Sequence, residues 1–162
     1  MGIKAEVMDR ALNVYLGSEA QWCTGAMARD RGGQYLEKAY DSEAVSHCAE
    51  GAIRAAVWDV ARQNRAIDVG LLNAVRIGVE RILVEQNPEI VEALLSSPSG
   101  DNSLVVRSGT SLPTFNDGFS FVEWGEDGVD VPKAVRRIPS IGYQGIRAAF
   151  EKYLSECEEK DL

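Results

Sequence analysis

Two of the three cysteines and the only histidine lie in two short tracts that resemble each other. The first tract is Trp22-Cys23-Thr24-Gly25-Ala26, and the second is His47-Cys48-Ala49-Glu50-Gly51-Ala52. A thiol with an imidazole base could act as a nucleophile, as in the cysteine hydrolases, and Asn116 or Asp117 could orient the imidazole. The candidate catalytic residues are therefore Cys23, Cys48, His47, Asn116 and Asp117.

A second interpretation gives the same tracts a packing role, and we favour it. Free cysteine is usually a buried, small apolar residue. A glycine inside a helix costs about 1 kcal/mol relative to alanine, so Gly51 predicts a compensating close contact. In this interpretation Cys23 and Cys48 are inert, and His47 lies at the surface beside a buried stripe of alanines.

The sequence lacks the motifs of several common metal-binding and phosphate-binding sites. It has one histidine and no Cys-x-x-Cys pair, so we expect no metal site of the Cys/His type. The acidic residues between Asp117 and Asp130 do not have the spacing of an EF-hand. Neither a phosphate-binding Gly-x-x-x-x-Gly-Lys-Ser/Thr loop nor a Gly-x-Gly-x-x-Gly motif occurs, so we expect no cofactor.

Charge and composition restrict the partners. The 162 residues carry a net charge of −8, which disfavours direct binding to nucleic acid and suits partners with basic surfaces. No apolar run approaches the ~20 residues of a membrane span, and no secretory signal is evident. The odd number of cysteines is typical of a reduced compartment, so we expect a cytoplasmic protein with no membrane contact.

Hydrophobic periodicity predicts a mostly α, compact domain of about five to seven helices with a small β-hairpin or irregular arm at about 100–128. We expect a single domain over 1–162, with a helical core at 1–97, a loop or β arm at 98–128 and C-terminal helices at 129–158. The expected helices span 3–16, 20–30, 41–64, 68–87, 89–95, 130–138 and 141–157. A turn at Asn116-Asp117-Gly118 between aromatic residues indicates a hairpin.

The arm carries the predicted binding residues. Aromatic residues on an acidic arm suit a protein interface, although they could also fold the arm onto the helices. The candidates are Phe119, Phe121, Glu123, Trp124, Glu126 and Asp127. The arm could also join copies of the chain into a homo-oligomer.

The order of the tracts resembles an uncharacterised domain family of bacteria and their phages. Its pattern is Trp-x-x-Gly-Ala, then Cys-x-x-Gly-Ala, then an aromatic-Asn-Asp step, here Trp22 with Gly25-Ala26, Cys48 with Gly51-Ala52, and Phe115-Asn116-Asp117. The chain departs from the family in having Phe115 where tryptophan is usual and an extra helical stretch at about 66–95. Cys23 is not part of the pattern.

The resemblance implies no activity, but it implies a small cytosolic protein often carried by phages or mobile elements. With the charge, it predicts an acidic binding protein that modulates or inhibits a host protein, such as a host-defence protein, by competing for a basic nucleic-acid-binding surface. The alternatives are a cysteine-dependent hydrolase or transferase and a homo-oligomeric structural protein.

Overall fold

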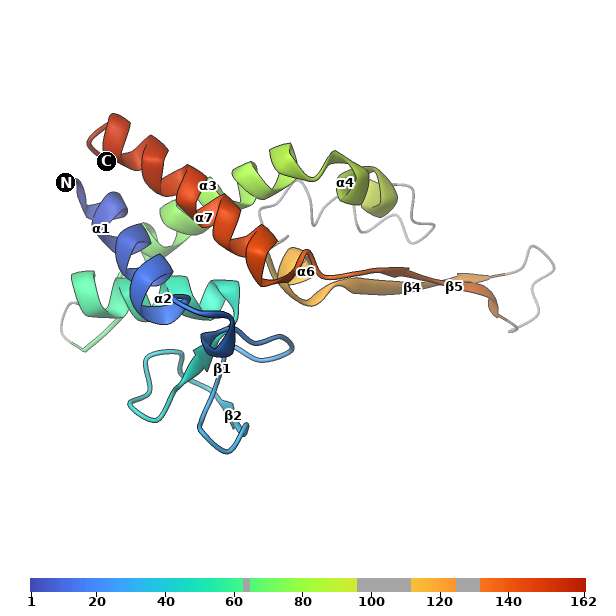
Figure 1. Ribbon diagram of the computed structural model, residues 1–162, viewed down its shortest axis with the longest axis horizontal. Helices are drawn as coiled ribbons and strands as arrows, with labels where there is room; N and C mark the ends of the chain where they lie inside the picture. The colour runs from blue at the N-terminus through green and yellow to red at the C-terminus, as the bar shows by residue number, and fades with distance from the viewer. Residues whose placement is uncertain (63–64, 96–111, 125–131) are drawn as a thin grey trace.

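A computed structural model describes residues 1–62, 65–95, 112–124 and 132–162 of the chain. Most of these residues form helices, and two small sheets complete the fold (Figure 1). The elements in chain order are α1 (Ile3–Arg10), a π-helical turn (Ala11–Tyr15), a 3₁₀ turn (Glu19–Gln21), β1 (Ala28–Arg29), β2 (Tyr35–Leu36), β3 (Ser46–His47), α2 (Ala49–Ala61), α3 (Val69–Gln86), α4 (Pro88–Leu95), α6 (Leu112–Asp117), β4 (Phe119–Trp124), β5 (Pro132–Ile138) and α7 (Gly142–Glu159).

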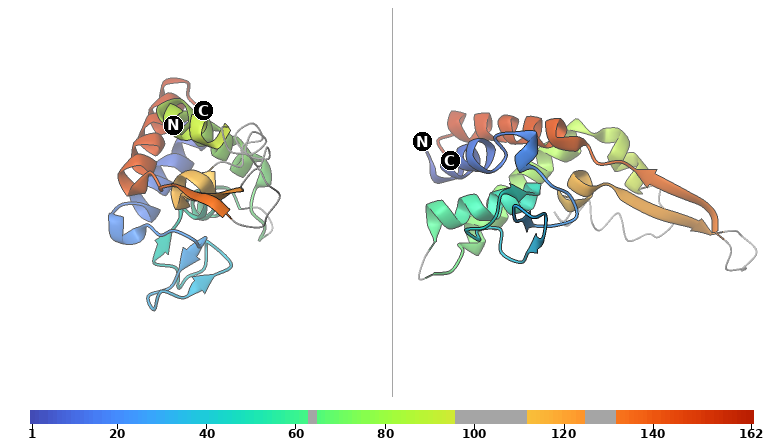
Figure 2. Two further views of the ribbon diagram at one scale, coloured as in Figure 1. Left: turned by 90° about the vertical axis from the view of Figure 1, so that its right-hand side faces the viewer. Right: turned by 60° about the horizontal axis from the view of Figure 1, so that its bottom comes forward.

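The core lies among α1, α2, α3 and α7, which pack against one another and enclose α6 at one end (Figures 1 and 2). Its largest fully buried side chains include Phe115, Phe150 and Met8. The mostly α fold expected from the sequence is therefore confirmed. Among the described residues, no helix is both long enough and apolar enough to cross a bilayer.

The long helices were predicted well where a stripe of large apolar residues faces the core. In α3, Asp68 caps the helix by accepting a hydrogen bond from the Leu71 amide at 2.9 Å, as its position before the apolar stripe indicated. In α7, Ile146 and Phe150 are fully buried, as expected. In the first helix, however, the helical spacing of Ile3, Val7, Ala11 and Val14 predicts one inner face, whereas Ile3 and Val14 are exposed.

The helix expected at 20–30 is replaced by the end of the 3₁₀ turn, by bends and by β1, which belongs to a small antiparallel sheet. Its strand order is β2-β1-β3, with Ala28 opposite both Leu36 and His47. The prediction of a helix at 20–30 was therefore wrong. Gly25 has a left-handed φ of +67°, which interrupts any helix there, and Gly33 closes the turn between β1 and β2 with a φ of +80°.

The next helix begins later than the sequence indicated. We expected it to start at Asp41 or Ser42, but residues 46–47 form β3 and α2 starts at Ala49. The cap is Cys48, whose Sγ accepts a hydrogen bond from the Gly51 amide at 3.3 Å. Ala44 and Val45 therefore do not belong to the inner face of this helix, and Val45 is exposed.

A long antiparallel ribbon, β4–β5, follows α6 and runs away from the helical body (Figure 1; Figure 2, right). A hairpin was expected near this place, but its turn was placed wrongly. Residues 112–117 form α6 instead, whose first amide, from Leu112, donates to Glu80 of α3 at 3.1 Å. The helix expected at 130–138 was also wrong, since 132–138 forms β5 and 130–131 lie outside the described residues.

The base of the ribbon is tied to the body at several points. Gly118 has a φ of +77°, and a Cβ there would lie 2.7 Å from the Ile138 carbonyl oxygen and the Ser140 amide nitrogen. The Ile141 amide donates to the Phe115 carbonyl at 3.1 Å, and the Ser140 hydroxyl donates to the Asn116 carbonyl. The chain therefore leaves the end of β5 directly beside the end of α6.

Candidate functional site

The predicted catalytic residues come together in one junction, and Asn116 is its centre. The Asn116 side chain is 1% exposed. Its Oδ1 accepts from the Trp22 indole N–H at 2.8 Å and from the Ala49 amide at 3.0 Å. Its Nδ2 donates to the Cys23 carbonyl at 3.1 Å. A single amide side chain thus links α6, the 22–26 tract and the start of α2.

Asp117 adds a second connection between the same segments. Its Oδ1 accepts from the Gly25 amide at 3.0 Å and from Nδ2 of Asn116 at 2.6 Å. The left-handed φ of Gly25 is the local reason that glycine stands at this turn. The Asn-Asp step therefore holds the first tract through its backbone.

The glycine of the second tract is required by a close approach. A Cβ on Gly51 would lie 1.9 Å from the Met27 carbonyl oxygen, and the same carbonyl accepts from the Cys48 amide at 3.2 Å. The close contact expected at Gly51 is thus confirmed. Its partner is the bend just before β1 rather than a second helix.

The two thiols are not activated. Burial raises the pKa of the Cys48 thiol to about 12, although the Gly51 amide opposes the shift and the thiol lies at a helix N-terminus. Burial also raises the pKa of Cys23, against the opposing hydrogen bond with Ser46 and the charge of Arg29. At both thiols the effect of desolvation on the pKa therefore exceeds the opposing effects.

His47 is buried, not at the surface as expected. It is 3% exposed, and its ring packs edge-on against Tyr15 with centroids 4.9 Å apart. Its Nε2 lies 2.8 Å from the Ala39 carbonyl oxygen, which can only accept, so Nε2 carries the proton. Among the described residues the buried Nδ1 has no hydrogen-bond partner, and burial lowers the pKa of the ring.

The arrangement does not support nucleophilic chemistry. Within the described ranges, no hydrogen bond joins either thiol to the imidazole, and the amide of Asn116 contacts the backbone and Trp22 rather than His47. The His47 carbonyl accepts instead from the Cys23 amide at 3.0 Å. Cys23, His47, Cys48, Asn116 and Asp117 are close because they hold the fold together.

Comparison with protein families matches residues 4–120 to DUF6197, a family of unknown function. The chain belongs to DUF6197. The matched region contains all three tracts of the junction, which confirms the resemblance to an uncharacterised domain family. Strand β5 and helix α7 lie beyond the matched DUF6197 region. No match was found among curated proteins or among solved structures.

The predicted binding residues lie on or beyond β4. Phe119, Phe121, Glu123 and Trp124 occupy β4, where the register places Phe119 opposite Ile138 and Phe121 opposite Arg136. Glu126 and Asp127 lie outside the described residues. The prediction that this region is an arm agrees with the projecting ribbon.

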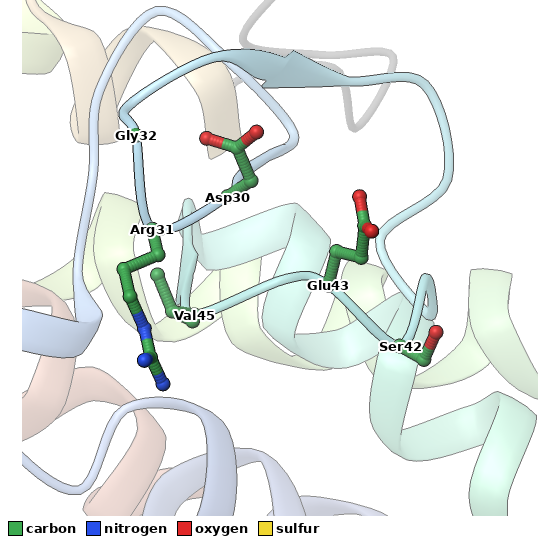
Figure 3. Close-up of a pocket in the computed structure, with 6 residues that line it drawn as sticks. All are labelled: Asp30, Arg31, Gly32, Ser42, Glu43 and Val45. Carbon is green, nitrogen blue, oxygen red and sulfur yellow. The ribbon is translucent and has the colours of Figure 1, made fainter.

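A shallow pocket of about 350 Å³ lies between the loops around β2 (Figure 3). The carboxylates of Asp30 and Glu43 come from separate loops, and the side chain of Arg31 extends away from both. Oδ1 of Asp30 already accepts from the Gln34 amide at 2.8 Å. In the part of the chain that the structure describes, no group of three or more His, Cys, Asp or Glu could hold a metal ion.

Sequence reasoning missed the residues that support the junction from outside. Tyr15, the Ala39 carbonyl and Ser140 each contact it from a different segment. A distinguishing signal existed only for the two glycines, whose positions predicted special backbone or close contact. The remaining contacts depend on loops whose conformation the sequence pattern did not reveal.

Proposed function

We propose that this DUF6197 member is a binding protein that modulates another protein, and that the β4–β5 ribbon is its partner-binding element. The observation that carries the proposal is the position of the ribbon. Its two strands pair with each other in a two-stranded sheet and run away from the helices (Figures 1 and 2).

A projecting two-stranded ribbon is marginally stable in water by itself and offers strand edges to a partner. Peptide backbones commonly add to such edges, and aromatic residues commonly anchor interfaces. The sequence of β4 contains Phe119, Phe121 and Trp124, and we propose these aromatic residues as the anchors.

Charge supports a protein partner over a nucleic acid. The net charge of −8 repels a phosphate backbone, and a host protein with a basic nucleic-acid-binding surface is the partner that this charge complements. We therefore place the protein among small acidic modulators of the kind that phages and mobile elements encode for their hosts.

The test compares the full chain with a shortened ribbon. Replacing residues 121–136 by Asn-Gly keeps the pairs Phe119↔Ile138 and Ser120↔Arg137 and closes them with a favoured two-residue turn. Both proteins are used to capture partners from host lysate at low and high salt, and the captured protein is then identified and titrated.

The expected result is a stoichiometric partner that binds the full chain and is lost with the shortened ribbon, while the circular dichroism and Tm of the two proteins agree. Capture that is equal for both proteins would refute the role of the ribbon. Light scattering on both proteins tests whether the ribbon instead joins copies of the chain. A stable homo-oligomer of the full chain that is lost on shortening would show that it does.

A further inference from the structure

Three basic side chains line one pocket on the side of α2 away from the ribbon's base. The pocket has a volume of about 640 Å³ and is lined by Lys38, Tyr40, Trp58, Arg62 and Arg65. Two separate segments build it: the loop before β3 contributes Lys38 and Tyr40, and the end of α2, with Arg65 beyond it, contributes the rest. A concentrated positive site is unexpected in a chain of net charge −8.

An aromatic stack holds the two segments together. The rings of Tyr40 and Trp58 lie 4.0 Å apart at 5° to each other, and the guanidinium carbon of Arg62 lies 5.9 Å from the Trp58 ring centroid. Both rings are half-buried. The stack fixes one wall of the pocket and the cation–π contact orients Arg62 across it.

The three cations have no acidic partners among the residues that the structure describes. Lys38, Arg62 and Arg65 are exposed and take part in none of the ion pairs there. Asp59 directly follows Trp58, yet its carboxylate is occupied by Arg10 and Tyr15. Like charges are thus gathered without neutralisation.

The backbone of Arg65 adds a second sign of a special site. Its φ is +63°, a left-handed conformation that side chains with a Cβ adopt rarely. Strained conformations of this kind are concentrated at binding sites, where they aim a side chain.

We propose that this pocket binds a small molecule that bears a phosphate group. The planar guanidinium of arginine matches phosphate oxygens with paired hydrogen bonds, and lysine adds a compact charge. The volume is in the usual range for small-ligand sites. The net charge of the whole chain disfavours a long polyanion, whereas a small ligand experiences mainly the charges within a Debye length of about 10 Å.

Arg62 is also the C-cap of α2, so its positive charge interacts favourably with the negative end of the helix dipole. If stabilising the helix were the whole role of Arg62, the pocket would bind no phosphate-bearing ligand, and replacing Arg62 would change only the stability of the protein. The experiment therefore measures both stability and binding for every variant.

Calorimetric titration of the full chain with pyrophosphate and with ADP at low salt is the direct test. Arg62→Gln, Arg65→Gln and Lys38→Gln should each weaken binding of both probes about tenfold. Arg31→Gln, an exposed arginine in the pocket of Figure 3, is the matched control and should leave affinity unchanged. Tm measured without ligand shows whether each variant is folded.

Two results would overturn the proposal: no binding of either probe to the unmodified chain, or equal weakening by the control variant. Binding of ADP well above that of pyrophosphate would assign the site to a nucleotide, and equal binding would assign it to the phosphate group alone. The site does not depend on the partner-binding role of the ribbon, so the chain with the shortened ribbon should bind both probes with unchanged affinity.

Discussion

Asn116→Ala tests whether the junction stabilises the fold. The substitution removes hydrogen bonds from Oδ1 to Trp22 and Ala49, and from Nδ2 to Cys23 and Asp117. The Ala49 amide is the critical loss, because Ala49 is fully buried and, among the described residues, its N–H donates to Asn116 alone. A buried donor without a partner costs about 1–3 kcal/mol.

The other lost contacts add to this cost with smaller contributions. Trp22 and Cys23 are half-buried, so water can replace part of their bonding, and each contact contributes about 0.5–1.5 kcal/mol. We therefore expect the free energy of unfolding to fall by about 3–4 kcal/mol, which lowers Tm by about 10 °C for a chain of this size.

Urea denaturation followed by circular dichroism at 222 nm measures this loss. The control is Asn13→Ala, because Asn13 is exposed and its amide donates to Asp9, four residues earlier on the protein surface. It should cost a few tenths of a kcal/mol. If Asn116→Ala loses less than about 1 kcal/mol, the junction is not the main connection that we describe.

Three further predictions concern single residues. Gly51→Ala should lower the free energy of unfolding by about 2 kcal/mol or more in denaturant titration, because the new Cβ would meet the Met27 carbonyl, although alanine has the better helix propensity. The control Gly70→Ala should be neutral or stabilising, because a Cβ there would lie 3.4 Å from Oδ1 of Asp68, an ordinary contact. A thiol reagent at pH 7 should label Cys23 slowly and Cys48 more slowly still, and rapid labelling of either would reopen the enzyme hypothesis. Since burial lowers the pKa of His47, its contribution to stability is present above the unfolded pKa of about 6.5 and is lost as pH falls through the folded pKa, at no more than about 1.4 kcal/mol per pH unit. His47→Gln should flatten that profile in denaturant titrations between pH 7 and 5, and an unchanged profile would assign the acid sensitivity to another group.

The sequence predicted the fold where one periodic signal was strong. The apolar stripe of α3 and the Asp68 cap determined that helix, and the inner residues of α7 were identified in the same way. These helices are long and amphipathic, so local pattern and tertiary packing agree.

Prediction failed where long-range pairing decides the conformation. Residues 132–138 have a sequence that a helix would accept, and pairing with β4 makes them a strand. Residues 20–30 have a composition that a helix would accept, yet they form the end of a 3₁₀ turn, bends and a short strand, with a left-handed φ at Gly25 and a hydrogen bond from Asn116 to the Cys23 carbonyl. Neither influence lies within a window of local sequence.

The sequence singled out the residues of the junction but not the contacts that join them. Cys23, His47, Cys48, Asn116 and Asp117 do meet, yet the polar atoms that face one another are largely backbone groups, which a residue pattern cannot reveal. The basic pocket was missed because Lys38 and Arg65 are far apart in the sequence and neither belongs to a recognisable motif.

The fastening of the ribbon at its root affects how it would be recognised. Gly118 lies against the Ile138 carbonyl and the Ser140 amide, and Ser140 and Ile141 bond to the last residues of α6. These contacts hold the base of the ribbon in one orientation relative to α6. The proposed complex on the ribbon would therefore lose less orientational entropy than one formed on a loosely attached segment, and a smaller contact area would give the same affinity.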